Sequence, residues 1–172
     1  MGAVFSDSLI ASAWESIQNA FRLARQGSAL MEQGRFEDAA RAFDGALELM
    51  PRLDRARFAL AECYLRMGRP DLSAATCRKM IELDQQNVRA YLNLAAIYRH
   101  QNLLLRAVDV LEEGLAMVPE DMNLLYGLAV AHVELGDTAR AIDYYRRIIK
   151  LDPSRADIKE ELERLSAIKT RR

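Results

Sequence analysis

A repeat of 34 residues constrains the fold of this chain more than any other feature. When the sequence is shifted against itself by multiples of 34, Gly34, Gly68 and Gly136 align, and Asn102 takes the same position in the third copy. Glycine, and after it asparagine, most readily adopts the left-handed conformation that ends a helix. The period therefore predicts four consecutive copies of one helix–turn–helix unit.

The four copies follow one another without insertions, and together they fill most of the chain. In each copy a first apolar-periodic helix ends at the aligned Gly or Asn, and a second helix begins at once. Pro51, Pro119 and Pro153 close three of the copies, since proline cannot continue a helix. The second copy carries Gln85 there, so we expect its boundary to be the least sharp. The predicted copies are residues 20–53, 54–87, 88–121 and 122–155.

Small residues recur at two further positions of the period, where close helix crossings need them. One set is Gly27, Ala61, Ala95 and Ala129, and the other is Ala39, Ser73, Ala107 and Ala141. In period and in these positions the chain resembles the tetratricopeptide-repeat family over residues 20–155. The resemblance implies an all-α, right-handed superhelical solenoid of antiparallel helix pairs. Arg57 and His132 depart from it, because the family prefers a large apolar and an aromatic residue at those positions.

The two ends carry amphipathic patterns outside the repeats. Residues 1–19 are expected to form an N-terminal helix, capped by Ser6 or Asp7, and no Gly or Pro separates it from the first repeat. Its apolar stripe has intervals of 4, 3 and 4 residues and consists of Ile10, Trp14, Ile17 and Phe21. Residues 156–172 are expected to form a capping helix with a frayed tail, because a terminal repeat needs its apolar face covered.

Composition narrows the function. A formal net charge of -1 and a pI of about 6.2 lack the positive field on which nucleic-acid binding rests. Two cysteines and no stretch of about 20 apolar residues indicate a cytoplasmic protein without a membrane span. The excess of Arg over Lys and the abundant Ala favour a bacterial source.

No set of residues in the sequence predicts catalysis. The two histidines, His100 and His132, fall at different depths of different repeats. There is no glycine-rich phosphate loop, no metal-ligand spacing and no nucleophile with a base nearby. We therefore expect neither an enzyme nor a bound cofactor or metal.

The family resemblance implies a partner-binding groove lined by the first helices of successive repeats. Apolar residues and an excess of arginine at those positions predict a partner peptide or helix with apolar anchors and net negative charge. The pattern of Lys and Asn that clamps the C-terminal carboxylate of heat-shock chaperones is missing, so such tails are not expected to bind. The groove set is Phe21, Arg25, Arg55, Phe58, Glu62, Leu65, Arg66, Arg89, Leu92, Asn93, Arg99, Asn123, Tyr126 and Val130.

Two alternatives to this scaffold role rest on apolar residues outside the groove set. Trp14 in the N-terminal helix, or Leu103 and Leu105 at an inter-helix turn, could mediate homo-oligomerisation. The same N-terminal helix could instead lie on a membrane surface. Its polar side carries Glu15 and Arg22 rather than a row of cations, so attraction to anionic lipid would be weak.

Overall fold

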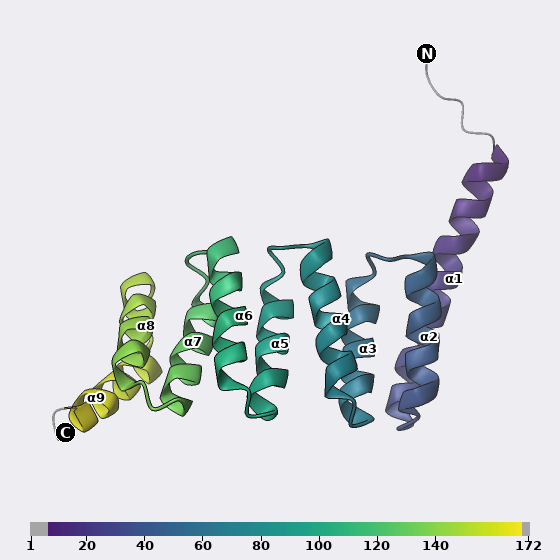
Figure 1. Ribbon diagram of the computed structural model, residues 1–172. Helices are drawn as coiled ribbons and strands as arrows, with labels where there is room; N and C mark the ends of the chain where they lie inside the picture. The colour runs from purple at the N-terminus through teal and green to yellow at the C-terminus, as the bar shows by residue number, and fades with distance from the viewer. Residues whose placement is uncertain (1–6, 170–172) are drawn as a thin grey trace, which may run out of the picture. The chain divides into compact units, whose positions relative to one another are not determined.

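The computed structural model describes residues 7–169, and over these residues it contains nine helices and no strand (Figure 1). The expected all-α class is confirmed. The possible cap Ser6 and residues 170–172 of the expected frayed tail lie outside the described residues. The helices are α1 (Asp7–Glu32), α2 (Phe36–Leu49), α3 (Asp54–Arg66), α4 (Pro70–Leu83), α5 (Val88–His100), α6 (Leu104–Met117), α7 (Met122–Glu134), α8 (Thr138–Leu151) and α9 (Ala156–Lys169).

The chain divides into two compact units, which are described separately. The first unit, Met1–Leu83, holds α1 to α4, and the second, Asp84–Arg172, holds α5 to α9. Within each unit every helix packs on the next one along the chain, and α1 also touches α3 as α5 touches α7. The short turns between successive helices make neighbouring helices antiparallel (Figure 1).

The aligned glycines and asparagine end the first helix of each pair. Gly34, Gly68 and Gly136 have φ values of 74°, 69° and 77°, and Asn102 has 58°. After α1 the amide of Arg35 donates to the carbonyl of Leu30 at 2.9 Å, and the amide of Gly34 donates to Met31 at 2.9 Å. These two bonds form a Schellman motif, which satisfies the last carbonyls of the helix.

The core of the first unit depends on a close approach of α1 and α2. Gly27 faces the ring of Phe43, and a Cβ atom on Gly27 would lie 2.8 Å from that ring. The backbones can come this near only because Gly27 has no side chain. The buried residues around Phe43 are Ala39, Ala40, Leu47, Ala56, Leu60 and Cys63.

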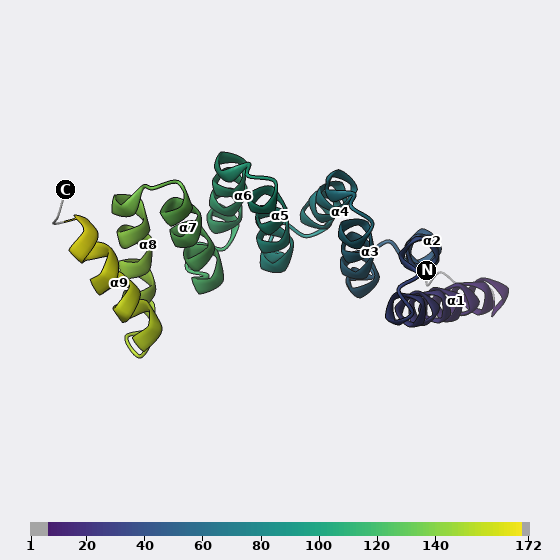
Figure 2. The same cartoon turned by 90° about the horizontal axis from the view of Figure 1, so that it is seen from below.

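The second unit also brings two helices close together at a glycine, and it is covered at its end by α9. Gly114 on α6 faces Tyr91 on α5, and a Cβ atom there would lie 2.8 Å from Tyr91 Cγ. Helix α9 packs on α8 (Figure 2) and buries Ile158 and Leu165 in the core around Tyr145. The apolar face of α8 is therefore shielded from water by an amphipathic helix.

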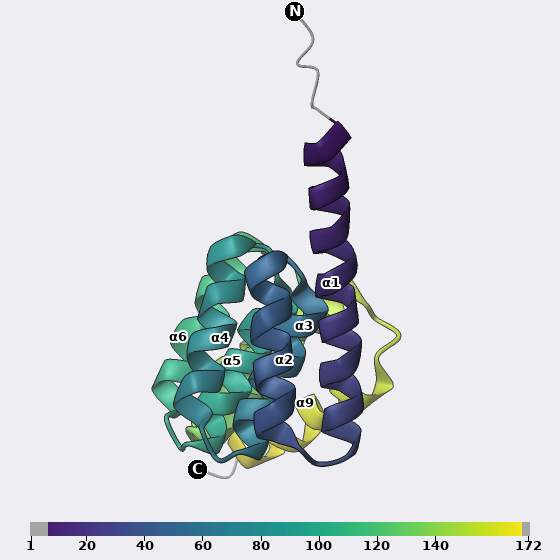
Figure 3. The same cartoon turned by 90° about the vertical axis from the view of Figure 1, so that its right-hand side faces the viewer.

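Helix α1 is continuous from Asp7 to Glu32 and is the longest helix described, at 26 residues. Figure 3 shows its N-terminal half extending past the end of α2. Helix α2 covers α1 from Ala20 onward, since Ala20 is buried whereas Leu9, Ile10 and Trp14 are exposed. We call residues 9–19 the projecting half of α1.

The second repeat lacks a closing proline, and side-chain hydrogen bonds define the turn before α5 instead. Asn87 caps α5 by accepting from the amide of Ala90 at 3.1 Å. The Asp84 carboxylate accepts from the amide of Gln86 at 3.0 Å, and the Tyr91 hydroxyl donates to the Gln85 carbonyl at 3.2 Å.

The two departures from the family pattern are both buried. Arg57 donates through Nη2 to the carbonyl of Pro51, while its Nε has no partner among the described residues. His132 stacks on Tyr144, with ring centroids 5.6 Å apart and planes 16° apart. Burial lowers the pKa of His132, so the ring is neutral inside the fold at neutral pH.

Candidate functional site

The first candidate surface lies on α1 and α3 and combines exposed apolar side chains with arginines. We call it the α1–α3 face, and it consists of Phe21, Arg25, Arg55, Phe58, Glu62, Leu65 and Arg66. Phe21 and Leu65 are each 46% exposed, whereas Phe58 is half-buried. Two large apolar side chains therefore remain available for contact.

The arginines of the α1–α3 face are largely unpaired. Within the described part of the chain, Arg25 and Arg55 make no ion pair or hydrogen bond through their side chains, and both are exposed. The guanidinium of Arg66 lies over the ring of Phe36, 4.6 Å from the ring centroid. Such a contact leaves the donors of the guanidinium open at its edges. With Glu62 as its one carboxylate, this set carries a net positive charge.

The second candidate surface lies on α5 and α7, and one of its two arginines forms an ion pair that joins these helices. We call it the α5–α7 face, and it consists of Arg89, Leu92, Asn93, Arg99, Asn123, Tyr126 and Val130. Arg99 Nε donates to Glu134 Oε2 at 2.8 Å, and Arg99 Nη2 also donates to Glu134 Oε1. This bidentate pair joins the two helices, raises the pKa of Arg99 and lowers the pKa of Glu134.

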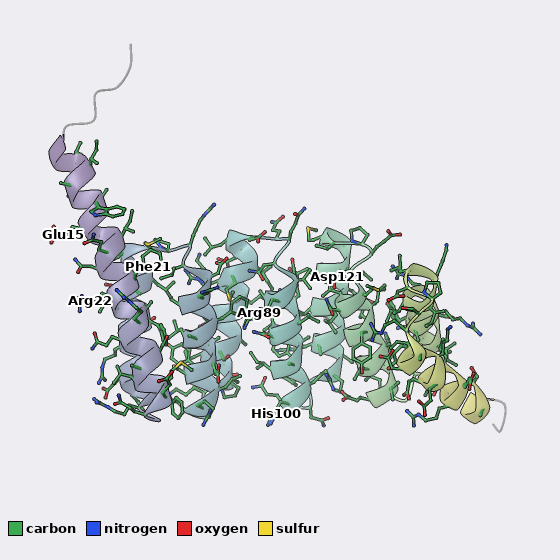
Figure 4. All side chains as sticks on the ribbon, turned by 180° about the vertical axis from the view of Figure 1, so that it is seen from behind. Glu15, Phe21, Arg22, Arg89, His100 and Asp121 are labelled. Atoms are coloured by element: carbon green, nitrogen blue, oxygen red, sulfur yellow. The ribbon has the colours of Figure 1, made fainter. Side chains whose placement is uncertain are left out.

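The remaining members of the α5–α7 face are Arg89 and a set of apolar, aromatic and amide side chains. Arg89 and His100 lie at opposite ends of α5 (Figure 4). Leu92 lies close to Gly127 on α7, since a Cβ atom on Gly127 would be 3.5 Å from Leu92 Cδ2. Tyr126 is 45% exposed, and Asn123 is exposed near the start of α7.

A cleft of about 290 Å³ opens beside Tyr126, and sequence reasoning found only part of it. The rings of Tyr126 and Tyr145, which both line it, have centroids 6.1 Å apart. Asp157 and Glu161 of α9 also line it, and they pair with Arg155 and Arg164. The residues contributed by α8 and α9 follow only from the docking of α9. The cleft is lined by Tyr126, Val130, Val133, Tyr145, Asp157, Ile158 and Glu161.

The residues singled out for self-association are exposed. Trp14 is 61% exposed on the projecting half of α1, and Leu105 is 69% exposed at the start of α6. Leu103 is also exposed, whereas Leu104 between them is half-buried. The single tryptophan of the chain thus stands in solvent, which is an unusual position for so large an apolar side chain.

The described residues offer no assembly for metal chemistry. No group of three or more His, Cys, Asp or Glu side chains among them could hold a metal ion. His100 is exposed at the end of α5, and His132 is buried in α7. Cys63 and Cys77 are free and buried, and burial raises the pKa of each thiol to about 11. No helix of the described part is long and apolar enough to cross a membrane.

Comparison with known families identifies the repeat. A tetratricopeptide-repeat family model matches residues 24–88 and 101–156, and a second such model matches residues 76–109. The chain belongs to the tetratricopeptide-repeat family. Members of this family serve in general as protein-interaction scaffolds, and that role applies to this chain.

Similar proteins agree with this assignment. The inactive peptidyl-prolyl cis-trans isomerase shutdown of Bombyx mori is 32% identical over 96 residues, which are 55% of this chain and 21% of that protein. The chain thus spans about a fifth of the length of this curated relative. A crystal structure of MamA superposes with a TM-score of 0.70 at 20% identity, covering 89% of this chain and 84% of that one. YrrB, described as a TPR protein with an unusual peptide-binding site, gives a TM-score of 0.64 at 16% identity, with coverage of 98% and 87%.

Proposed function

We propose that this protein is a non-catalytic adaptor that binds an acidic peptide or helix with apolar anchors on the first helices of its repeats. The proposal rests on two arginines, Arg25 and Arg55, whose side chains make no ion pair or hydrogen bond within the described residues. They belong to the same α1–α3 face as the exposed side chains of Phe21 and Leu65. A partner's carboxylates would supply the acceptors that these guanidinium groups lack within the described residues. Arginine is suited to this role because its planar donors match a carboxylate in two-point contacts.

The apolar side chains would supply most of the binding energy. Large, partly exposed aromatic and aliphatic residues are where binding energy concentrates in protein interfaces, whereas charges at the rim mainly set orientation and selectivity. Phe21 and Leu65 would therefore accept the partner's apolar anchors. The arginines would exclude basic partners.

The α5–α7 face would make a different contribution. Because Glu134 already neutralises Arg99, this face offers an acidic partner one arginine fewer than its sequence suggests, and Tyr126 with Leu92 offers apolar contact. Asn93 and Asn123 carry both donors and acceptors, which suit the backbone of an extended peptide. The preference for an acidic partner would thus reside in the first unit.

Two further observations are consistent with this proposal. YrrB, whose overall fold is similar, is described as having a peptide-binding site, which makes peptide binding on this scaffold physically reasonable. The two buried free thiols suit a reducing compartment, and we propose a cytoplasmic location for that reason.

A paired affinity experiment tests the proposal. The purified chain and a variant carrying Arg25→Glu and Arg55→Glu are used as baits in lysate of the source organism, and retained proteins are identified by mass spectrometry. A control bait carries Arg41→Glu and Lys79→Glu, which make the same change of charge on the second helices α2 and α4 of the same unit.

The proposal predicts a protein that is retained by the wild-type and control baits and lost from the Arg25/Arg55 variant. Calorimetry with the bound segment of that protein should then show at least about tenfold weaker binding to the variant, and weaker binding to all forms at high salt. Equal retention by all three baits would show that the α1–α3 face is not the binding surface.

A further inference from the structure

The projecting half of α1 carries an apolar stripe that no other described element covers. Ile10, Trp14 and Ile17 are exposed on it, and the stripe continues into Phe21 of the α1–α3 face. Large apolar side chains in a continuous row on a protein surface are typical of an interaction site.

The spacing of the row fits another helix. Intervals of 4, 3 and 4 residues match the alternation of d and a positions along the heptads of a coiled coil. Trp14 and Phe21 then take the a positions of a heptad, and Ile10 and Ile17 take the d positions.

The row is also symmetric about its midpoint, so it fits an antiparallel copy of itself. Reversing the order of the intervals 4, 3 and 4 leaves them unchanged. An antiparallel second copy centred between positions 15 and 16 therefore sets Trp14 against the partner's Ile17 and Ile10 against the partner's Phe21. Each layer then combines an a residue with a d residue, and a two-fold axis relates the two helices. We propose that two copies of this chain associate through the projecting halves of α1, paired antiparallel in this register.

The residues that flank the row favour self-association. Ala11, Ala13 and Gln18 border it and carry no charge, so two identical copies meet without like-charge repulsion. Alanine on both borders allows a close approach of the two backbones. The charged residues Glu15 and Arg22 are exposed on the polar side of α1, and Figure 4 marks their places on the helix.

The register also leaves room for the remainder of each copy. Helix α2 covers α1 only from Ala20 onward, and antiparallel pairing places that part of one copy opposite residue 11 and the residues before it in the other. An aromatic side chain can bury about 150–250 Å². Trp14 and Phe21 each still expose about half of their surface. Together with Ile10, Ile17 and the flanking alanines they would bury about 500 Å² per copy in the dimer. A total of about 1,000 Å² is at the lower limit for a specific interface, and it predicts a dissociation constant of about micromolar or weaker.

Sedimentation equilibrium of the full chain tests the proposal. The mean mass should rise from 19.5 kDa toward twice that value as the concentration increases through about 1 to 500 μM. Trp14→Lys and Ile17→Glu should each weaken dimerisation at least about 100-fold. The control Leu105→Lys changes a highly exposed apolar residue outside the row and should leave the dimer intact. Circular dichroism of each variant verifies that helix content is unchanged, which is expected because the substituted side chains are exposed.

Mixing the two variants tests the register. The new lysine at position 14 of one chain would face the new glutamate at position 17 of the other, so an equimolar mixture should form heterodimers. A constant monomer mass over the whole range would overturn the proposal, as would dimers that survive both substitutions. A mixture that remains monomeric would overturn the antiparallel register. Flotation of a monomeric chain with vesicles containing phosphatidylserine would assign the row to a membrane instead.

This inference does not depend on the proposed partner binding. Trp14 and Ile17 lie outside the α1–α3 face, and Arg25 and Arg55 lie outside the row. Loss of dimerisation in the Trp14→Lys variant and loss of partner in the Arg25/Arg55 variant are therefore separate outcomes. Phe21 belongs to both surfaces, so an acidic partner that anchors on Phe21 should compete with dimerisation.

Discussion

Replacing Gly114 by alanine should destabilise the protein, even though alanine is the better helix former. A Cβ atom at position 114 would lie 2.8 Å from Tyr91 Cγ and 3.1 Å from Tyr91 Cβ. Both atoms lie close to the backbone of α5, and Tyr91 is almost fully buried. The contact can therefore be relieved only by moving α5 away from α6.

The magnitude follows from two opposing terms. Alanine in place of glycine inside a helix contributes about 1 kcal/mol of stability. Forcing a methyl group into a close-packed core costs about 1–3 kcal/mol. The net loss at position 114 should be about 1 kcal/mol, which corresponds to a decrease in Tm of about 2–4 °C for a chain of this size.

The matched control is Gly45→Ala in α2. A Cβ atom there would meet only the Cδ1 methyl of Leu23 at 3.3 Å, and Leu23 is half-buried and can rotate away. The helix-propensity term should then dominate, and the variant should gain about 0.5 kcal/mol. Urea unfolding followed by far-UV circular dichroism measures both variants. If Gly114→Ala proves as stable as Gly45→Ala, helix packing at Tyr91 does not depend on the missing side chain.

Three further predictions concern single positions. Asn102→Gly should stabilise the fold by about 0.5–1 kcal/mol, because Asn102 has a φ of 58° where the other repeats carry glycine; an unchanged urea midpoint would contradict this. The pKa of His132 is lowered in the folded protein, so the unfolded chain binds more protons than the folded one at acidic pH. The stability of the fold should therefore fall as the pH drops below about 6.5. The His132→Phe variant should lose less stability than the wild type when thermal unfolding is compared between about pH 7.5 and 5. Cys63 and Cys77, each with a pKa of about 11, should resist alkylation at about pH 8 until urea unfolds the chain, and rapid native labelling would refute their burial.

The helices could be predicted from sequence because local chemistry determines where they end. Gly34, Gly68, Asn102 and Gly136 mark four helix ends, and a left-handed residue is required there whatever packs nearby. The absence of glycine or proline between residues 7 and 26 allowed a continuous α1 but did not require one. These features depend on residues a few positions apart.

The site was less predictable because it depends on contacts between repeats. Arg99 is a groove position by sequence, and only the structure pairs it with Glu134 and neutralises its charge on the α5–α7 face. Tyr145 and Asp157 enter the cleft beside Tyr126 only once α9 has docked on α8. Side-chain pairing between helices depends on rotamers and docking angles, which the repeat period does not determine.

The restriction of helix contacts to near neighbours has a consequence for how the protein opens. Among the described helices, no contact reaches further along the chain than from one first helix to the next, such as α5 to α7. Loop-closure entropy is therefore small at every step, and folding should be fast for a chain of this length. Parts of the chain can therefore unfold without the rest. Amide hydrogen exchange should be fastest in α9 and in the projecting half of α1, and slowest in α2 and α6. A destabilising substitution in one repeat should accelerate exchange there and in the adjoining helices, while more distant helices keep their protection.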